Sequence, residues 1–194
     1  MSAKAEKKDL SRERILASAG SLVRGKGISG ASVAGVMEGA GMTVGGFYAH
    51  FPSKKALVEE AMRETLRQSR GNLEAGAHDL RGAEWVMAAA RAYLSRAHRD
   101  HPEAGCPLPA TLGEISREDP AVREVLAREL NAIVSEIAVH LEEAGVENPR
   151  GEAMALMAEM VGGLTLARAL KDTSLSDAVL KSCRGHIERS LPGG

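Results

Sequence analysis

The segment from Ser32 to Lys54, SVAGVMEGAGMTVGGFYAHFPSK, constrains the fold of this chain more than any other feature. Its apolar residues recur at helical spacing as far as Ala40, stop at Gly41 and resume at Val44. Two short helices joined by a tight turn that contains glycine form a helix-turn-helix, a unit that lays its second helix in the major groove of DNA. The segment therefore predicts a small helical head that binds double-stranded DNA.

A more specific pattern, FYAHFPSK, occupies residues 47–54 of the 194-residue chain. This pattern resembles the TetR family of transcriptional repressors, and the resemblance is strong over residues 10–60. Beyond those residues it rests on chain length and helix layout. The resemblance implies an all-helical protein of about nine helices, in which an N-terminal DNA-binding domain precedes a domain that binds an effector and forms a homodimer.

The composition agrees with a helical protein of ordinary globular character. Hydrophobic residues make up 44% of the chain but aromatic residues only 3%, so the apolar content is mostly Ala, Leu, Val and Met, which favours helices over strands. No run of about 18 apolar residues occurs, so no membrane span is predicted. The first residues lack the apolar region of a secretory signal, and two cysteines do not suggest a disulfide framework. We therefore expect a cytoplasmic protein.

The net charge of −1 conceals an asymmetry along the chain. Residues 1–55 hold nine Lys and Arg against four Asp and Glu, whereas the remaining residues hold 16 against 22. A basic N-terminal part on an acidic body fits phosphate binding at one end of the protein, although chance clustering of surface charge is the alternative explanation. We predict a DNA-binding domain over residues 1–55 and an effector-binding and dimerisation domain over residues 56–194.

Helix starts are predicted at residues that cap helices. Ser11, Ser32, Thr43 and Ser53 are expected to cap the first four helices, and Asp119 followed by Pro120 is a strong helix start. Ser174 and Asp177 resemble a capping box. Gly25 and Gly27 are expected to end the first helix and Gly145 the seventh. The predicted helices cover, approximately, residues 11–25, 32–40, 43–51, 54–69, 82–99, 106–116, 120–145, 150–170 and 175–190.

The third predicted helix carries the expected DNA-reading surface. Val44, Phe47 and Phe51 are expected to pack on apolar residues of the first two helices, namely Ile15, Val33 and Met37. The resemblance implies that Tyr48 donates its hydroxyl group to a phosphate and that Lys54, with a helix N-terminus, meets another. The resemblance also implies that Thr43 and His50 contact base edges or the DNA backbone and that Ser32 contacts a phosphate.

Each of these residues has a simpler explanation. Tyr48 is alternatively a core residue, Ser32 and Thr43 act only as helix caps, and Lys54 belongs to an ordinary solvated pair. His50 taken alone is a weak indication of DNA contact.

Gly45 and Gly46 stand where many members of the resembled family carry larger side chains. Two glycines weaken a helix by roughly 1 kcal/mol each relative to alanine, and they remove groups that could read bases. We hypothesise that they allow the backbone to approach DNA closely, with a larger share of recognition through phosphates and DNA shape.

The C-terminal part contains candidates for the two other expected functions. Apolar residues of the last two helices form the expected dimer interface, with an internal core as the alternative: Met157, Met160, Val161, Leu164, Leu175, Val179, Cys183 and Ile187. Residues of the middle helices are candidates for the effector pocket, although core packing is the more common role for each: Trp85, Tyr93, Cys106, Leu108, Leu112, Ile133 and Ile137.

Cys106 is expected at a helix N-terminus after a polar loop that contains His98 and His101. A helix N-terminus and cationic neighbours stabilise a thiolate, so a thiol switch is one interpretation of Cys106 and an inert small residue is the other. The two histidines do not have the spacing of a metal site, and no cofactor or metal is predicted.

The chain contains no Gly-rich phosphate loop, nucleophile elbow or paired carboxylate site, so an enzyme is not predicted. The leading hypothesis is a repressor released from a near-palindromic operator by a small-molecule or thiol-reactive effector. The alternative is an architectural DNA-binding dimer without an effector.

Overall fold

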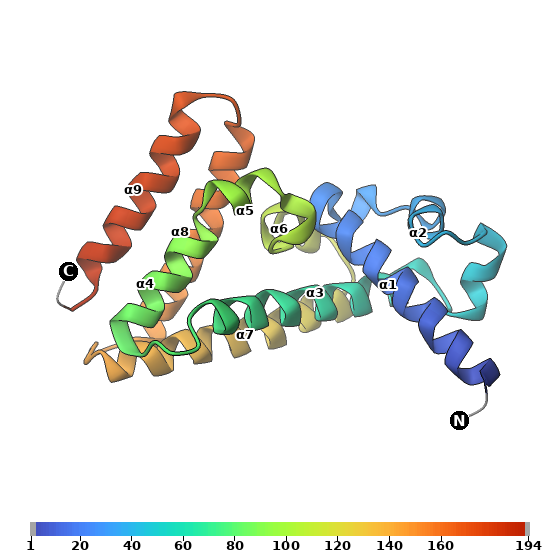
Figure 1. The fold of residues 1–194 in the computed structure, drawn as a ribbon, viewed down its shortest axis with the longest axis horizontal. Coiled ribbons are helices and arrows are strands. Elements are labelled where there is room, and N and C mark those ends of the chain that lie inside the picture. Colours follow the sequence, from blue (N-terminus) through green and yellow to red (C-terminus); the bar gives the residue numbers. More distant parts are fainter. Residues whose placement is uncertain (1–2, 193–194) are drawn as a thin grey trace. The chain divides into compact units, whose positions relative to one another are not determined.

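The computed structural model describes residues 3–192, and this part of the chain forms nine α-helices and two 3-10 helices without a β-strand (Figure 1). The all-helical fold predicted from the sequence is confirmed. None of the described helices combines the length and the apolar character that crossing a membrane requires.

The chain divides into two compact units. Unit 1 contains the residues up to Leu66 together with Glu103–Ala127, and unit 2 contains Arg67–Pro102 together with the residues from Arg128 onward. The chain first passes from unit 1 to unit 2 within one helix, α3 (Lys54–Gly76). The division by function between residues 1–55 and 56–194 stays a prediction.

Unit 1 begins with α1 (Ala3–Gly30), which starts well before the predicted cap at Ser11. Ser11 lies inside the helix and its hydroxyl donates to the carbonyl oxygen of Lys7 at 2.9 Å, so the prediction of a cap was wrong. The preceding residues are rich in Ala, Lys and Glu, which propagate a helix without difficulty. The helical dihedral angles break at Gly27, where φ is 74°, close to the predicted end.

The remaining elements of unit 1 are α2 (Val33–Gly39), η1 (Val44–Ala49), the start of α3, α6 (Leu108–Ile115) and the start of α7 (Pro120–Glu143). Helix α6 packs against α1. The carboxylate of Glu114 accepts hydrogen bonds from the backbone amides of Ile28 and Ser29, at 2.5 and 3.1 Å, just after the break at Gly27. This contact ties the end of α1 to α6.

Unit 2 contains the rest of α3 and α7 and four further helices: α4 (Gly82–Tyr93), α5 (Arg96–Asp100), α8 (Pro149–Ala169) and α9 (Ser174–Ser190). The short helix η2 (Pro102–Ala104) lies where the chain returns to unit 1. The single helix predicted over residues 82–99 was wrong, because it divides into α4 and α5 at Leu94. The Leu94 carbonyl accepts a hydrogen bond from Arg184, and the Ser95 hydroxyl caps α5 by accepting from the His98 amide at 3.1 Å. These two contacts satisfy the backbone groups that the break exposes.

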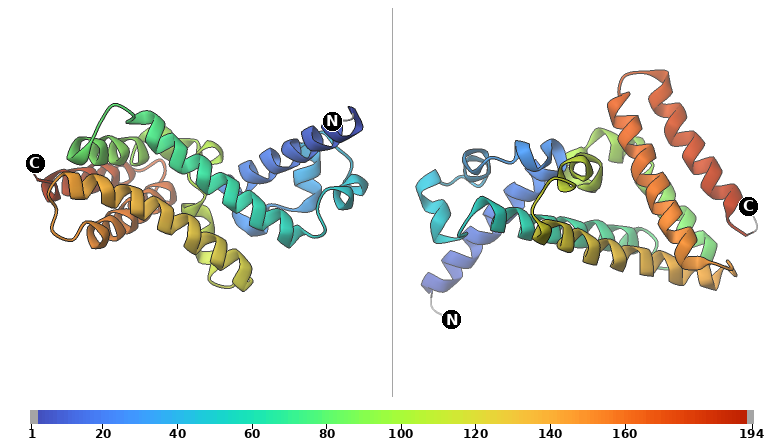
Figure 2. Two further views of the ribbon diagram at one scale, coloured as in Figure 1. Left: turned by 90° about the horizontal axis from the view of Figure 1, so that it is seen from below. Right: turned by 180° about the vertical axis from the view of Figure 1, so that it is seen from behind.

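Helices α8 and α9 lie side by side as an antiparallel pair, and α4 packs against both (Figures 1 and 2). Thr173, and not Ser174, caps α9, since its hydroxyl accepts from the Ser176 amide at 3.3 Å. Asp177 therefore takes no part in a capping box with Ser174, and its carboxylate instead binds Arg96. The predicted start of α7 after Asp119 is confirmed, because the Asp119 carboxylate accepts from the Ala121 amide at 3.0 Å.

Candidate nucleic-acid interface

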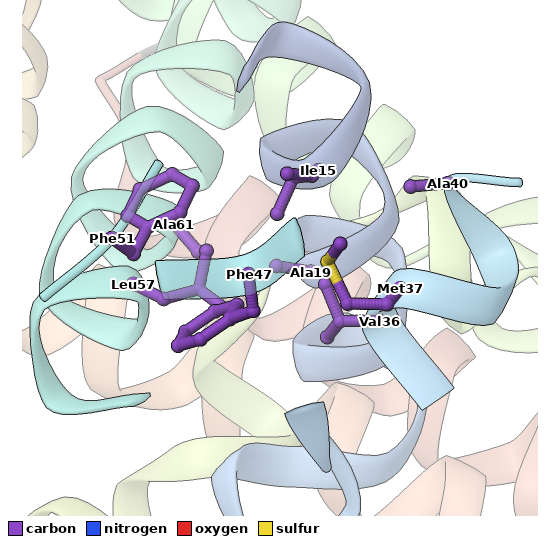
Figure 3. Close-up of a cluster of buried hydrophobic side chains, with 9 residues drawn as sticks. All are labelled: Ile15, Ala19, Val36, Met37, Ala40, Phe47, Phe51, Leu57 and Ala61. Carbon is purple, nitrogen blue, oxygen red and sulfur yellow. The ribbon is translucent and has the colours of Figure 1, made fainter. Parts of the chain in front are cut away.

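A cluster of buried side chains from α1, α2, η1 and α3 forms the core of the N-terminal head (Figure 3). Phe47 and Phe51 are almost fully buried, and their stacked ring centroids lie 6.0 Å apart. Val44, which was expected in this core, is 51% exposed. It is the first residue of the short helix η1, and the chain reaches the core only one turn later, at Phe47.

The turn between α2 and η1 is held by hydrogen bonds from α1. Gly41 adopts a φ of 67°, a conformation that glycine reaches without strain. Arg14 donates to the carbonyl oxygen of Ala40 at 2.6 Å, and Ser18 donates to the carbonyl oxygen of Val36 at 2.8 Å. The sequence reasoning missed both residues, although their spacing of four places them on one side of α1.

Side-chain capping is present at two of the three predicted helix starts of the head that follow α1. The Ser32 hydroxyl accepts from the Gly35 amide at 3.1 Å, and the Ser53 hydroxyl accepts from the Ala56 amide at 3.1 Å, so both predicted caps are confirmed. Thr43 precedes η1 but its side chain makes no capping hydrogen bond. The Thr43 side chain is exposed, so its hydroxyl is directed to the surface without a role in the helix start.

Tyr48 lies on the outer side of η1 with 74% of its surface exposed, so the alternative that it belongs to the core is wrong. Its ring meets the buried ring of Phe47 edge-on, with centroids 5.2 Å apart. His50 is half-buried, and its Nδ1 atom is buried without a hydrogen-bond partner among the described residues. The exposed part of the His50 ring is therefore what remains for contact with another molecule.

The fold does not require glycine at residues 45 and 46. Neither Gly45 nor Gly46 has a positive φ. A Cβ atom at Gly45 would meet nothing within 4 Å, and one at Gly46 would lie 3.8 Å from the Met37 side chain, an ordinary contact. Larger side chains would fit both positions within the chain itself.

Two adjacent lysines at the start of α3 have different surroundings. Lys55 forms an ion pair with Asp119 at 2.8 Å, which raises the pKa of Lys55 and lowers that of Asp119 mainly through their hydrogen bond. No ion pair involves Lys54 within the described residues. Further along α3, Glu60 forms a salt bridge with Arg12 of α1. The Arg12 guanidinium also lies over the Phe51 ring, 4.7 Å from the ring centroid.

The predicted effector residues fall in both units. In unit 2, Trp85, Tyr93, Ile133 and Ile137 are buried, and Trp85 and Ile137 line one small cavity of about 10 Å³. That volume is near the smallest that holds one water molecule. In unit 1, Cys106 and Leu108 are buried, whereas Leu112 is 40% exposed.

The sequence reasoning missed two polar groups in unit 2. His140 stacks on Trp85 with ring centroids 4.2 Å apart, and its Nδ1 lies 3.0 Å from the Glu143 carboxylate. Burial, followed by a hydrogen bond with Glu74, raises the pKa of Glu136 to about 7. The Arg70 guanidinium, 3.7 Å from each of these two carboxylates, acts in the opposite direction.

The predicted dimer residues divide by exposure within one protomer. Leu175 is exposed, Val179 and Cys183 are partly exposed, and the others are buried: Met157, Met160, Val161, Leu164 and Ile187. The buried residues belong to the contact between α8 and α9 and their neighbours. Met154 and Leu166 on α8 are large apolar residues that remain exposed and that the sequence reasoning did not single out.

Comparison with known proteins identifies the family. A family model described as bacterial regulatory proteins of the tetR family matches residues 15–61, and a model described as the tetracyclin repressor-like C-terminal domain matches residues 82–183. A search of curated proteins found no match.

Solved structures share the fold. A TetR transcriptional regulator from Chloroflexus aurantiacus is 22% identical with a TM-score of 0.81, and 95% of each chain is covered. The TetR family regulator from Cytophaga hutchinsonii is 20% identical with a TM-score of 0.82, covering 97% of this chain and 98% of the other. The reduced form of E. coli NemR is 18% identical with a TM-score of 0.80, covering 95% and 99%. The chain thus belongs to the TetR family of DNA-binding transcriptional regulators.

Proposed function

We propose that the chain is a homodimeric repressor that binds a near-palindromic operator and that an effector releases it. The observation that carries the proposal is the exposed surface of η1, opposite the buried cluster of the head. The DNA contacts that we propose are the predicted ones: Ser32, Thr43, Gly45, Gly46, Tyr48, His50 and Lys54.

Tyr48 and Lys54 are the proposed phosphate contacts. The exposed Tyr48 ring packs edge-on against the buried Phe47 ring, and this contact positions the Tyr48 hydroxyl. Lys54 begins α3, where backbone amides and the helix dipole favour an anion. Because Lys55 is engaged by Asp119, it serves as the matched control for Lys54.

Fluorescence anisotropy with DNA that flanks the gene tests these assignments across a range of salt concentrations. Lys54→Gln should reduce the slope of log affinity against log salt by about one, since one phosphate contact is lost. Lys55→Gln should change the slope less. Tyr48→Phe should weaken binding by up to about tenfold for all DNA sequences alike. Equal slopes for the two lysine variants would contradict the assignment of Lys54.

Gly45 and Gly46 support close approach of the backbone to DNA, because the fold itself leaves room for side chains at both. Gly46→Ala should make η1 more stable by up to about 1 kcal/mol and still lower operator affinity. Thermal denaturation and anisotropy measure the two effects separately. An unchanged operator affinity and sequence preference in Gly46→Ala would show that close approach at this position is not used.

The proposed dimer interface uses the outer faces of α8 and α9. Exposed Met154 and Leu166 on α8 and exposed Leu175 on α9 give these helices apolar surface that is not used within the protomer. Large apolar side chains left exposed on two adjacent helices support an interaction site there. Sedimentation of Leu166→Glu should show dissociation towards the monomer at concentrations at which the native chain is a dimer. A stable Leu166→Glu dimer would place the interface elsewhere.

Cys106 is the proposed target of a thiol-reactive effector. It is buried two residues before the start of α6. Burial lowers the pKa of the Arg24 guanidinium, and electrostatic attraction to Cys106 acts in the opposite direction. A cationic neighbour stabilises a thiolate. Because Cys106 is buried, only small oxidants are expected to reach it. Burial and then the charge of Glu159 raise the pKa of Cys183, so that cysteine is the less reactive control.

Operator binding before and after a small oxidant such as hydrogen peroxide tests the thiol switch. Cys183→Ser should lose affinity on oxidation as the native chain does, and Cys106→Ser should keep it. If oxidation releases Cys106→Ser from the operator as readily as the native chain, the switch does not use this residue.

A second candidate, an architectural DNA-binding dimer without an effector, is favoured by one observation. The cavity beside Trp85 and Ile137 has only about 10 Å³, so an apolar ligand there would have to displace side chains. A thermal-shift screen of small molecules discriminates the two candidates. Stabilisation that depends on ligand concentration supports an effector, and its absence together with insensitivity to oxidants supports the architectural role.

A further inference from the structure

A groove between α4 and α9 in unit 2, lined mainly by cationic residues, has no role in the function proposed above. It is a hollow of about 410 Å³, which lies within the range of about 300–1,000 Å³ that is usual for small-molecule sites. It is much larger than the cavity of about 10 Å³ beside Trp85. The groove therefore provides room for a ligand without any movement of the apolar core.

Cationic side chains dominate the lining of the groove: Arg91, Arg96, Lys181 and Arg184. One carboxylate, Asp177, lies among them, and it is already shared between Arg96 and Arg99 at 2.9 and 2.8 Å. Arg91 has a partner in Glu188 at 2.9 Å. These pairs hold the arginines in place while leaving further guanidinium N–H groups for an anion.

Lys181 and Arg184 carry positive charge into the groove without a carboxylate partner among the described residues. Arg184 donates to the backbone carbonyl of Leu94, which fixes its guanidinium at the break between α4 and α5. Lys181 is exposed and makes no ion pair with a described residue. The groove thus combines a cation held in position with one that is exposed, an arrangement suited to a carboxylate or phosphate group.

The groove and the proposed dimer interface use different sides of α9. At 3.6 residues per turn, Asp177, Lys181 and Arg184 lie roughly opposite the exposed Leu175. Contact of a partner protomer at Leu175 is therefore compatible with an open groove.

We propose that the α4–α9 groove is a binding site for a small anionic metabolite that carries carboxylate or phosphate groups. The site binds through Lys181 and Arg184, with Arg91 and Arg96 at its edge. Binding at this site does not depend on the apolar core of unit 2 or on Cys106, and it requires no DNA.

Isothermal titration of the full chain with citrate and, separately, with inorganic phosphate at constant ionic strength tests the site. The two probes distinguish a carboxylate site from a phosphate site. We expect saturable binding of at least one of them, with one site per protomer. Lys181→Gln should weaken that binding about tenfold, the effect of losing one charge-assisted hydrogen bond.

Lys171→Gln is the matched control, because it removes the same charge from an exposed position of unit 2 outside the groove. It should change the affinity by less than about twofold, as expected for a screened surface charge. Absence of saturable binding of both anions would overturn the proposal. So would equal weakening by the two variants, which would indicate attraction by net charge alone, or unchanged binding in Lys181→Gln.

Discussion

Replacement of Glu136 by glutamine should stabilise the protein by an amount that grows as the pH rises and is largest above neutral pH. The pKa of Glu136 is raised from its ordinary value of 4.5 to about 7, firstly by burial and then by the neighbouring Glu74. The folded state therefore binds more protons than the unfolded state between these two values. Its stability falls as the pH rises from about 4.5 to about 7 and stays at the lower level above that range.

The magnitude follows from the size of the shift. A rise from 4.5 to about 7 corresponds to at most about 3 kcal/mol. The Glu136 side chain is 20% exposed, so water screens part of the repulsion between the two carboxylates. We therefore expect an effect of about 1–2 kcal/mol on the free energy of unfolding. Glutamine keeps the shape of the protonated acid and cannot ionise, so Glu136→Gln should recover this amount at pH 8 and almost nothing at pH 5.

Thermal denaturation at fixed protein concentration measures the effect, since the stability of a dimer depends on concentration. For a chain of this length, 1–2 kcal/mol corresponds to a rise in Tm of about 2–8 °C at pH 8. Glu142→Gln, at an exposed position on the same helix α7, is the control for removal of a carboxylate. If the Tm difference between Glu136→Gln and the native chain were the same at pH 5 and pH 8, the reasoning would be refuted.

Three further substitutions, and Gly45→Ala as a control for one of them, probe unit 1. Phe47→Ala should lower the free energy of unfolding by about 3–5 kcal/mol in chemical denaturation, because the side chain is fully buried; a cost below 1 kcal/mol would contradict the packing of Figure 3. Gly39→Ala should cost about 1–3 kcal/mol, since its Cβ would lie 2.4 Å from the Ser18 hydroxyl, whereas Gly45→Ala, in open space, should cost nothing in the same assay. Glu114→Gln should cost about 1–2 kcal/mol by weakening its bonds to two α1 amides, and unchanged stability would show that this link is dispensable.

The helical class and the position of the DNA-binding head could be predicted because they depend on local signals. The apolar spacing before and after Gly41 reflects the period of a helix, and the caps at Ser32, Ser53 and Asp119 are contacts within a few residues. Such interactions are encoded by neighbours along the chain. Their confirmation follows from that short range.

Other features depended on residues far apart in the sequence. The helix predicted over residues 82–99 breaks at Leu94, where Arg184 from α9 binds the exposed carbonyl. Similarly, Glu114 meets the end of α1, and Arg14 holds the turn after Ala40. No local pattern indicates these partners, because the chain must fold before they meet.

Burial and charge environment likewise required the tertiary structure. The sequence identified Tyr48 as either a core residue or a DNA contact, and packing left it exposed beside buried Phe47. The raised pKa of Glu136 arises from its burial in the folded chain and then from the approach of Glu74 of α3. The sequence by itself determined the helical class, most of the helix positions and the place of the DNA-binding head. The tertiary structure decided which side chains are buried, which carboxyl group has a raised pKa and where four cations line one groove, because those properties depend on distance in space.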